Sequence, residues 1–224
     1  LSIQRSHSAS VTGSSSIKLN AGKVTGDIYG GGNNCGISST ADITINNGTV
    51  LGTIYGGAYQ NQVQGRSVIK VYGGTVNDIY GGNILTGVSQ QMGDTTNQEI
   101  KITIGDENAT TTPTVKGDIY GGGKFDKIEN SVIQLIKCST KPTVYGGSYS
   151  SGVTNKSSIY LMGMTVSTIY GGSNVGGNVT SANIYLQSGT VTDVYGGGYG
   201  GKGTEAGITL EGTATVTSIY GGSN

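Results

Sequence analysis

The tetrapeptide Ile28-Tyr29-Gly30-Gly31 decides the fold, because it returns at a nearly constant interval along the chain. Its successive spacings are 26, 25, 40, 25, 25, 25 and 25 residues. Self-similarity at such a period indicates a repeat architecture in which each copy stacks on the next. The eight copies, each an isoleucine or valine followed by Tyr-Gly-Gly, begin at Ile28, Ile54, Ile79, Ile119, Val144, Ile169, Val194 and Ile219.

A short alternating segment precedes each tetrapeptide, as in Ile17-Lys18-Leu19 and Ile43-Thr44-Ile45. Most repeats also carry Gly-Thr-Val between the two segments, for example at residues 48–50. Alternation with a period of two places one set of side chains inside and the other outside. Isoleucine and valine number 40 against eight leucines, and β-branched residues favour strands. The sequence therefore predicts an all-β chain with two or three short strands in each repeat.

The predicted architecture is a right-handed parallel β-helix, a β-solenoid of about eight coils of about 25 residues. Right-handedness is expected because parallel crossover connections overwhelmingly have that hand. A propeller blade needs about 40 residues or more, which exceeds this repeat. The Tyr-Gly-Gly glycines are expected to form the corners, by adopting φ values that bulky residues avoid.

The chain is predicted to contain a leader or partial coil over residues 1–15 and a single solenoid domain over residues 16–224. The one spacing of 40 residues is explained by two loop insertions, near residues 83–99 and 105–117, where extra surface loop costs little. The chain ends at Tyr220-Gly221-Gly222-Ser223-Asn224 without a polar capping segment. Solenoids need caps, so we expect a longer array or end-to-end stacking with another copy.

The 25-residue pattern resembles the parallel β-helix repeats of bacterial cell-surface and adhesin-like proteins, over about residues 16–224. The resemblance implies a rod that displays binding surfaces, and an extracellular or cell-surface location. The wider β-helix group also includes polysaccharide lyases and hydrolases, but no residue here matches their catalytic motifs. The expected function is therefore a structural or adhesive segment, with a polysaccharide-active enzyme or a self-assembling fibre subunit as alternatives.

The motif tyrosines occupy the same place in every coil and should align along the rod. On an outer face, their rings can stack on a glycan or on a host or cell-surface protein. In the other interpretation, the rings pack on one another and on the glycine corners, and so close that face. The candidate binding residues are Tyr29, Tyr55, Tyr80, Tyr120, Tyr145, Tyr170, Tyr195 and Tyr220.

A second aligned column consists of the short polar residues two positions before each motif tyrosine. Only Asp78 and Asp118 are carboxylates on adjacent coils, which is a minimal version of a paired acid or cation site. Asp, Thr and Ser are also ordinary turn residues, and no His or Arg recurs beside them. The column therefore predicts no catalytic residue, no metal ion and no cofactor. Its members are Asp27, Thr53, Asp78, Asp118, Thr143, Thr168, Asp193 and Ser218.

Three further features carry little functional weight. One threonine rank, including Thr49, Thr75 and Thr190, is too few for an ice-matching face, which needs two ranks. Cys35 and Cys138 should lie about four coils apart, about 19 Å by the strand spacing. That separation is too long for a disulfide, so both thiols are expected to be free. His7 is the only histidine, so no Ser or Cys triad has a base.

Charge and hydropathy limit the partners. Thirteen basic and thirteen acidic residues cancel without a run of either sign, so no long-range field attracts nucleic acid. No stretch approaches the roughly 20 apolar residues that span a bilayer, so no membrane insertion is expected in this segment. The remaining predicted partners are a glycan, a host or cell-surface protein, or another copy of the chain.

Overall fold

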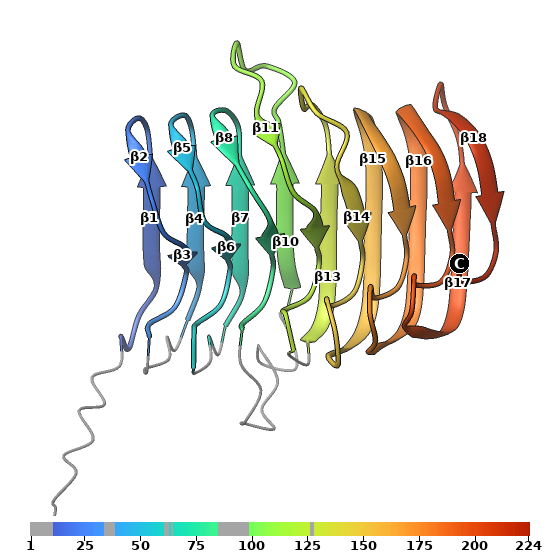
Figure 1. The fold of residues 1–224 in the computed structure, drawn as a ribbon, viewed down its shortest axis with the longest axis horizontal. Coiled ribbons are helices and arrows are strands. Elements are labelled where there is room, and N and C mark those ends of the chain that lie inside the picture. Colours follow the sequence, from blue (N-terminus) through green and yellow to red (C-terminus); the bar gives the residue numbers. More distant parts are fainter. Residues whose placement is uncertain (1–10, 34–38, 61–62, 64, 85–98, 126–127) are drawn as a thin grey trace, which may run out of the picture.

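A computed structural model describes residues 11–224 except 34–38, 61–62, 64, 85–98 and 126–127. All of the described regular structure is β, and the strands stack in parallel as a β-solenoid of about seven turns. Figure 1 shows the coils side by side along one axis, in chain order from β1 to β18. The all-β class and the parallel solenoid predicted from the repeat are confirmed.

Each coil begins with its longest strand, the one formed by the alternating segment. These strands pair in sequence order along one sheet, and their alternating segments align residue for residue. The pairing of β15 with β16 contains an irregularity after Leu161. Thus Ile17 aligns with Ile43, and Ile43 with Ile69. The strands are β1 (Ser15–Leu19), β4 (Ala41–Ile45), β7 (Ser67–Val71), β10 (Glu99–Ile104), β13 (Ile128–Leu135), β15 (Val153–Tyr170), β16 (Asn178–Tyr195) and β17 (Lys202–Leu210).

Two shorter strands complete most coils, whereas the coil that begins with β13 has only the last of them. The Gly-Thr-Val segment forms the second strand, namely β2 (Lys23–Val24), β5 (Thr49–Val50), β8 (Thr75–Val76) and β11 (Thr114–Val115). The Ile-Tyr segment forms the third, namely β3 (Ile28–Tyr29), β6 (Ile54–Tyr55), β9 (Ile79–Tyr80), β12 (Ile119–Tyr120) and β14 (Thr143–Tyr145). In the later coils these segments belong to β15, β16 and β18 (Thr215–Tyr220).

The interior is filled by aligned rows of Ile, Val and Leu from the three strands. Ile43, Ile69, Ile102 and Ile133 have no exposed surface, and the same holds for Ile54 in the third strand. Burying an isoleucine side chain contributes about 1.5–3 kcal/mol, so these rows supply most of the stability. A single coil cannot cover them alone, which is why the coils stack.

The glycines after the motif tyrosines serve a different purpose from the one expected. None of them has φ in the left-handed region, so the expected backbone reason is wrong. An added Cβ at Gly30 would lie 2.2 Å from the carbonyl oxygen of Gly56, because the next coil passes that close. Left-handed glycines instead precede the second strand in several coils, with φ values of 101° at Gly48 and 75° at Gly74.

Of the two expected insertions, most of the first (residues 85–98) lies outside the described residues. The second contains β11 and, before it, a loop that extends beyond the neighbouring coils (Figure 1). This loop is tied down on both sides. The Thr111 hydroxyl donates to the carbonyl of Tyr72 at 3.0 Å, and the Lys137 ammonium donates to the carbonyl of Ala109 at 3.3 Å.

Candidate functional site

The eight motif tyrosines form one continuous stack, which we call the tyrosine ladder. Their register is in phase across all eight coils, and successive ring centroids lie 4.5–5.3 Å apart with interplanar angles of 4–15°. The closest pair is Tyr80 and Tyr120, at 4.5 Å. Parallel strands set this spacing, because each coil rises by about one strand separation. The ladder therefore follows directly from the repeat.

The ring faces within the ladder are covered. The five central tyrosines, Tyr55 to Tyr170, are at most 7% exposed, and each is stacked on both sides. Tyr29 and Tyr195 are half-buried, while Tyr220 is 46% exposed. A flat ligand can thus stack on a free ring face only at an end of the ladder. The glycan-binding role expected for these eight residues stays a prediction, and the structure shows the mutual packing that was its alternative.

A second row of side chains, which we call the cover residues, lies four positions after each ladder tyrosine. The loop after each Tyr-Gly-Gly leans back over the preceding coil, where the amide of Tyr149 donates to the carbonyl of Gly123. Tyr149 meets Tyr80 and Tyr120 edge-on, at 6.4 and 5.7 Å. Sequence reasoning missed this row, although the spacing Tyr-Gly-Gly-x-Tyr was visible at Tyr59, Tyr149 and Tyr199.

Asparagine takes the place of the cover tyrosine in three coils, at Asn33, Asn174 and Asn224, and the last two bond the ladder hydroxyls. The side-chain amide of Asn174 donates to the hydroxyl of Tyr120 at 3.1 Å. The amide of Asn224 donates to the hydroxyl of Tyr170 at 3.4 Å. In both cases the partner lies two coils back along the rod. The cover residues therefore fix ring positions across three coils.

The polar column runs beside the ladder hydroxyls, as its position two residues upstream requires. The Tyr29 hydroxyl donates to a carboxylate oxygen of Asp27 at 2.9 Å, and the Tyr120 hydroxyl donates to Asp118 at 3.3 Å. Burial, followed by nearby negative charge, raises the pKa of Tyr80 above its ordinary value. Burial likewise raises the pKa of Tyr120. These two buried phenols therefore stay protonated near neutral pH.

The structure brings Asp78 and Asp118 together on adjacent coils. The backbone N–H of Asp118 donates to a carboxylate oxygen of Asp78 at 2.8 Å. Burial, followed by the charge of Asp78, raises the pKa of Asp118. Within the described residues no group of three or more His, Cys, Asp or Glu side chains is placed to hold a metal ion. Catalysis by this pair stays an untested alternative.

The other candidate features are dispersed. The threonines of the predicted rank align between coils. Thr114, which aligns with Thr75, also belongs to this rank. The Cys138 thiol is half-buried and lies 3.2 Å from the hydroxyl of Thr140. His7 and Cys35 lie outside the described residues.

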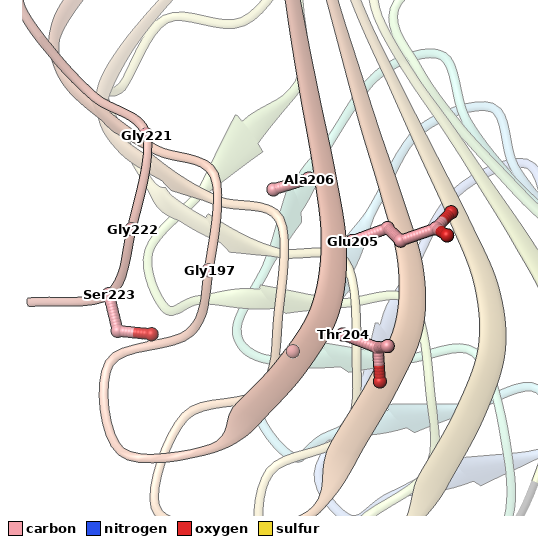
Figure 2. Close-up of a pocket in the computed structure, with 8 residues that line it drawn as sticks. Gly197, Thr204, Glu205, Ala206, Gly221, Gly222 and Ser223 are labelled. Atoms are coloured by element: carbon pink, nitrogen blue, oxygen red, sulfur yellow. The ribbon is translucent and has the colours of Figure 1, made fainter.

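A hollow of about 190 Å³ lies between the last two Gly-Gly corners and the strand β17. Figure 2 shows Ala206 facing the chain at Gly197 and Gly221, whereas Glu205 and Thr204 point away from it. No set of charged groups converges there, so the hollow has no apparent chemistry of its own.

The fold and these rows define the chain as a parallel β-solenoid with an internal tyrosine ladder. Comparisons with protein families, with curated proteins and with solved structures found no match. No described helix is long and apolar enough to cross a membrane.

Proposed function

We propose that this chain is a rigid structural segment of a secreted or cell-surface protein, and that it displays an adhesive surface along one face. The observation that supports this proposal is a difference in sequence variation between the two faces of the long strands. The inward position stays isoleucine in every coil, at residue 17 and its partners. The adjacent outward position changes from coil to coil, through Lys18, Thr44, Lys70, Thr103, Gln134, Tyr160, Tyr185 and Thr209.

The outward face of the first three coils offers the most suitable place for a ligand. A shallow groove of about 380 Å³ lies over β1, β4 and β7. Lys70 and Asp42 form an ion pair of 3.3 Å there, and about a third of each side chain is exposed. Asn46 and Tyr72 also line the groove. Amides, charged groups and an aromatic ring are the groups that bind the hydroxyls and faces of sugars, so we propose a glycan as the ligand.

The test is binding of the purified chain to a broad glycan panel, with release of products followed in the same samples. Saturable binding that Lys70→Ala and Tyr72→Ala weaken at least tenfold, without product release, is the expected result. Thr209→Ala changes the same outward row far from the groove and should leave affinity unchanged. If no glycan of the panel bound, a glycan ligand would be ruled out. If products were released and Asp78→Asn abolished their release, an enzyme would be favoured instead.

A self-assembling fibre subunit is the second proposal. Every described coil pairs in parallel with a neighbour of the same shape, so the same pairing can join coils of two copies. Leu210 of β17 and Ile219 of β18 lie in strands that would take part in it. Sedimentation should then reveal concentration-dependent filaments that Leu210→Lys and Ile219→Lys prevent. A strictly monomeric species at high concentration would contradict this proposal.

A further inference from the structure

The ladder consists of tyrosine in all eight coils, although the only demand that stacking makes is for a flat ring. Phenylalanine would stack as well, yet the single phenylalanine of the chain, Phe125, lies outside the ladder. The hydroxyls must therefore contribute something beyond the ring faces. They lie beside the polar column, which supplies carboxylates in four of the eight coils, at Asp27, Asp78, Asp118 and Asp193.

Stacked phenols beside carboxylates have a known chemical property. A phenol that loses an electron must also lose its proton, because the oxidised ring is strongly acidic. A hydrogen-bonded carboxylate accepts that proton, so oxidation becomes easier. Tyr29 with Asp27 and Tyr120 with Asp118 are such pairs, at 2.9 and 3.3 Å. The chain contains no tryptophan, so tyrosine is its most easily oxidised aromatic residue.

We propose that the tyrosine ladder conducts one-electron oxidation along the rod, from coil to coil. Seven steps connect Tyr29 to Tyr220, and no step exceeds 5.3 Å between ring centroids. Nearly parallel rings at this separation are in van der Waals contact, which permits direct electron exchange between neighbours. The ladder then serves as a path that draws oxidising equivalents away from the coil where they arrive. This inference is independent of the proposed glycan binding.

Each step balances in protons and electrons. An outer-sphere one-electron oxidant removes an electron from Tyr220, the most exposed ring of the ladder, and the phenolic proton passes to solvent. The resulting neutral radical takes an electron from Tyr195 and a proton from solvent or the polar column, which restores its phenol. Tyr195 releases its own phenolic proton to solvent or the polar column and becomes the next neutral radical, so each step consumes one proton and releases one. The radical moves in this way along the stack. At Tyr29 the released proton goes to the carboxylate of Asp27, which leaves a tyrosyl radical beside a neutral carboxyl group.

The experiment places an oxidant at one end of the ladder and a radical trap at the other. Both natural cysteines are replaced by serine, and Gly222→Cys carries a photo-oxidisable ruthenium polypyridyl complex. A Cβ at Gly222 meets no atom within 4 Å, so the site accepts the label. Position 29 carries 3-aminotyrosine, whose radical is lower in energy and has its own electron paramagnetic resonance spectrum. After a flash in the presence of a quencher, we expect the aminotyrosyl radical at position 29.

The deciding variant is Tyr120→Phe with Tyr145→Phe, which keeps two stacked rings but removes two oxidisable ones. Tyr149 lies edge-on to Tyr80 at 6.4 Å, so the same variant also carries Tyr149→Phe. The electron must then cross from Tyr80 to Tyr170 in one step, and the radical yield at position 29 should fall by at least an order of magnitude. The matched control is Tyr160→Phe with Tyr185→Phe, a stacked pair at 4.8 Å on the outer face of the long strands. It should leave the yield unchanged, and circular dichroism checks that both variants fold.

Two results would overturn the proposal. One is an absence of the aminotyrosyl radical when the ladder is intact and the ruthenium complex is oxidised. The other is an equal yield in the ladder and control variants, which would show that electrons bypass the stack. Asp118→Asn tests the polar column separately. This change leaves every ring in place, so slower transfer would support proton acceptance by the carboxylate, and an unchanged rate would remove the column from the path.

Discussion

Folding changes the pKa of the buried phenol groups of the ladder. Burial raises the pKa of Tyr80 and Tyr120 above the value of about 10 that tyrosine has in an unfolded chain. Because the folded pKa is the higher one, the neutral phenol contributes its full stability below pH 10. This contribution declines as the pH rises toward the folded pKa.

Alkaline titration should therefore separate the ladder from an unfolded chain. In urea, phenolate absorbance should rise near pH 10 for all tyrosines. In the folded protein, buried ladder tyrosines such as Tyr80 and Tyr120 should ionise only at higher pH. The measurement is phenolate absorbance against pH, with circular dichroism followed in parallel. Complete ionisation of all 14 tyrosines near pH 10 in a folded sample would contradict this expectation.

The paired carboxylates of Asp78 and Asp118 should make the free energy of unfolding depend on pH in the acid range. Since burial and the neighbouring charge raise the pKa of Asp118, its ionisation opposes folding at neutral pH. Asp118→Asn should thus increase the free energy of unfolding at pH 7 and lose this advantage at pH 3, where the native carboxyl is neutral. Urea unfolding at both pH values measures this. Asp193→Asn is the control, because Asp193 aligns with Thr168 and Ser218 and has no like charge beside it.

At the scale of the element, the corners depend on close approach between coils. An added Cβ at Gly146 would lie 1.9 Å from the hydroxyl of Ser157 and 2.4 Å from the carbonyl oxygen of Gly171. Because backbone on the next coil cannot yield easily, Gly146→Ala should lower the free energy of unfolding by about 3 kcal/mol. At Gly221 a Cβ meets nothing within 4 Å, so Gly221→Ala should change it by less than about 0.5 kcal/mol. If urea unfolding gave equal changes in the free energy of unfolding for the two variants, contact with the next coil would not explain why glycine is required at position 146.

For the whole molecule, stability should vary along the rod, because each coil touches only its neighbours. Among the described strands, β10 and β13 pair on both sides, whereas β1 and β17 pair on one side only. Ile133 is fully buried, while Ile208 in β17 is only partly buried. Local opening therefore costs least at the ends.

Hydrogen exchange tests this gradient. Amides of β10 and β13 should exchange most slowly, and those of β1 and β17 fastest. Ile133→Ala should cost about 2–5 kcal/mol and accelerate exchange in the central coils, whereas Ile208→Ala should act mainly on the last coil. Uniform protection along the rod would mean that the coils unfold together as one unit.

The sequence alone predicts the repeat, the parallel all-β class, the inward rows and the alignment of the tyrosines, because a constant period leaves one way to stack the coils. It also showed Asp78 and Asp118 as neighbours, since their position in the repeat is equivalent. The folded structure was needed to show that the ring faces cover one another and that the cover residues lean back over earlier coils. It also decided that Gly30 is required by contact and not by φ. The physical reason is that a period specifies which residues align, whereas covering and clashing depend on distances between coils that the sequence pattern does not contain.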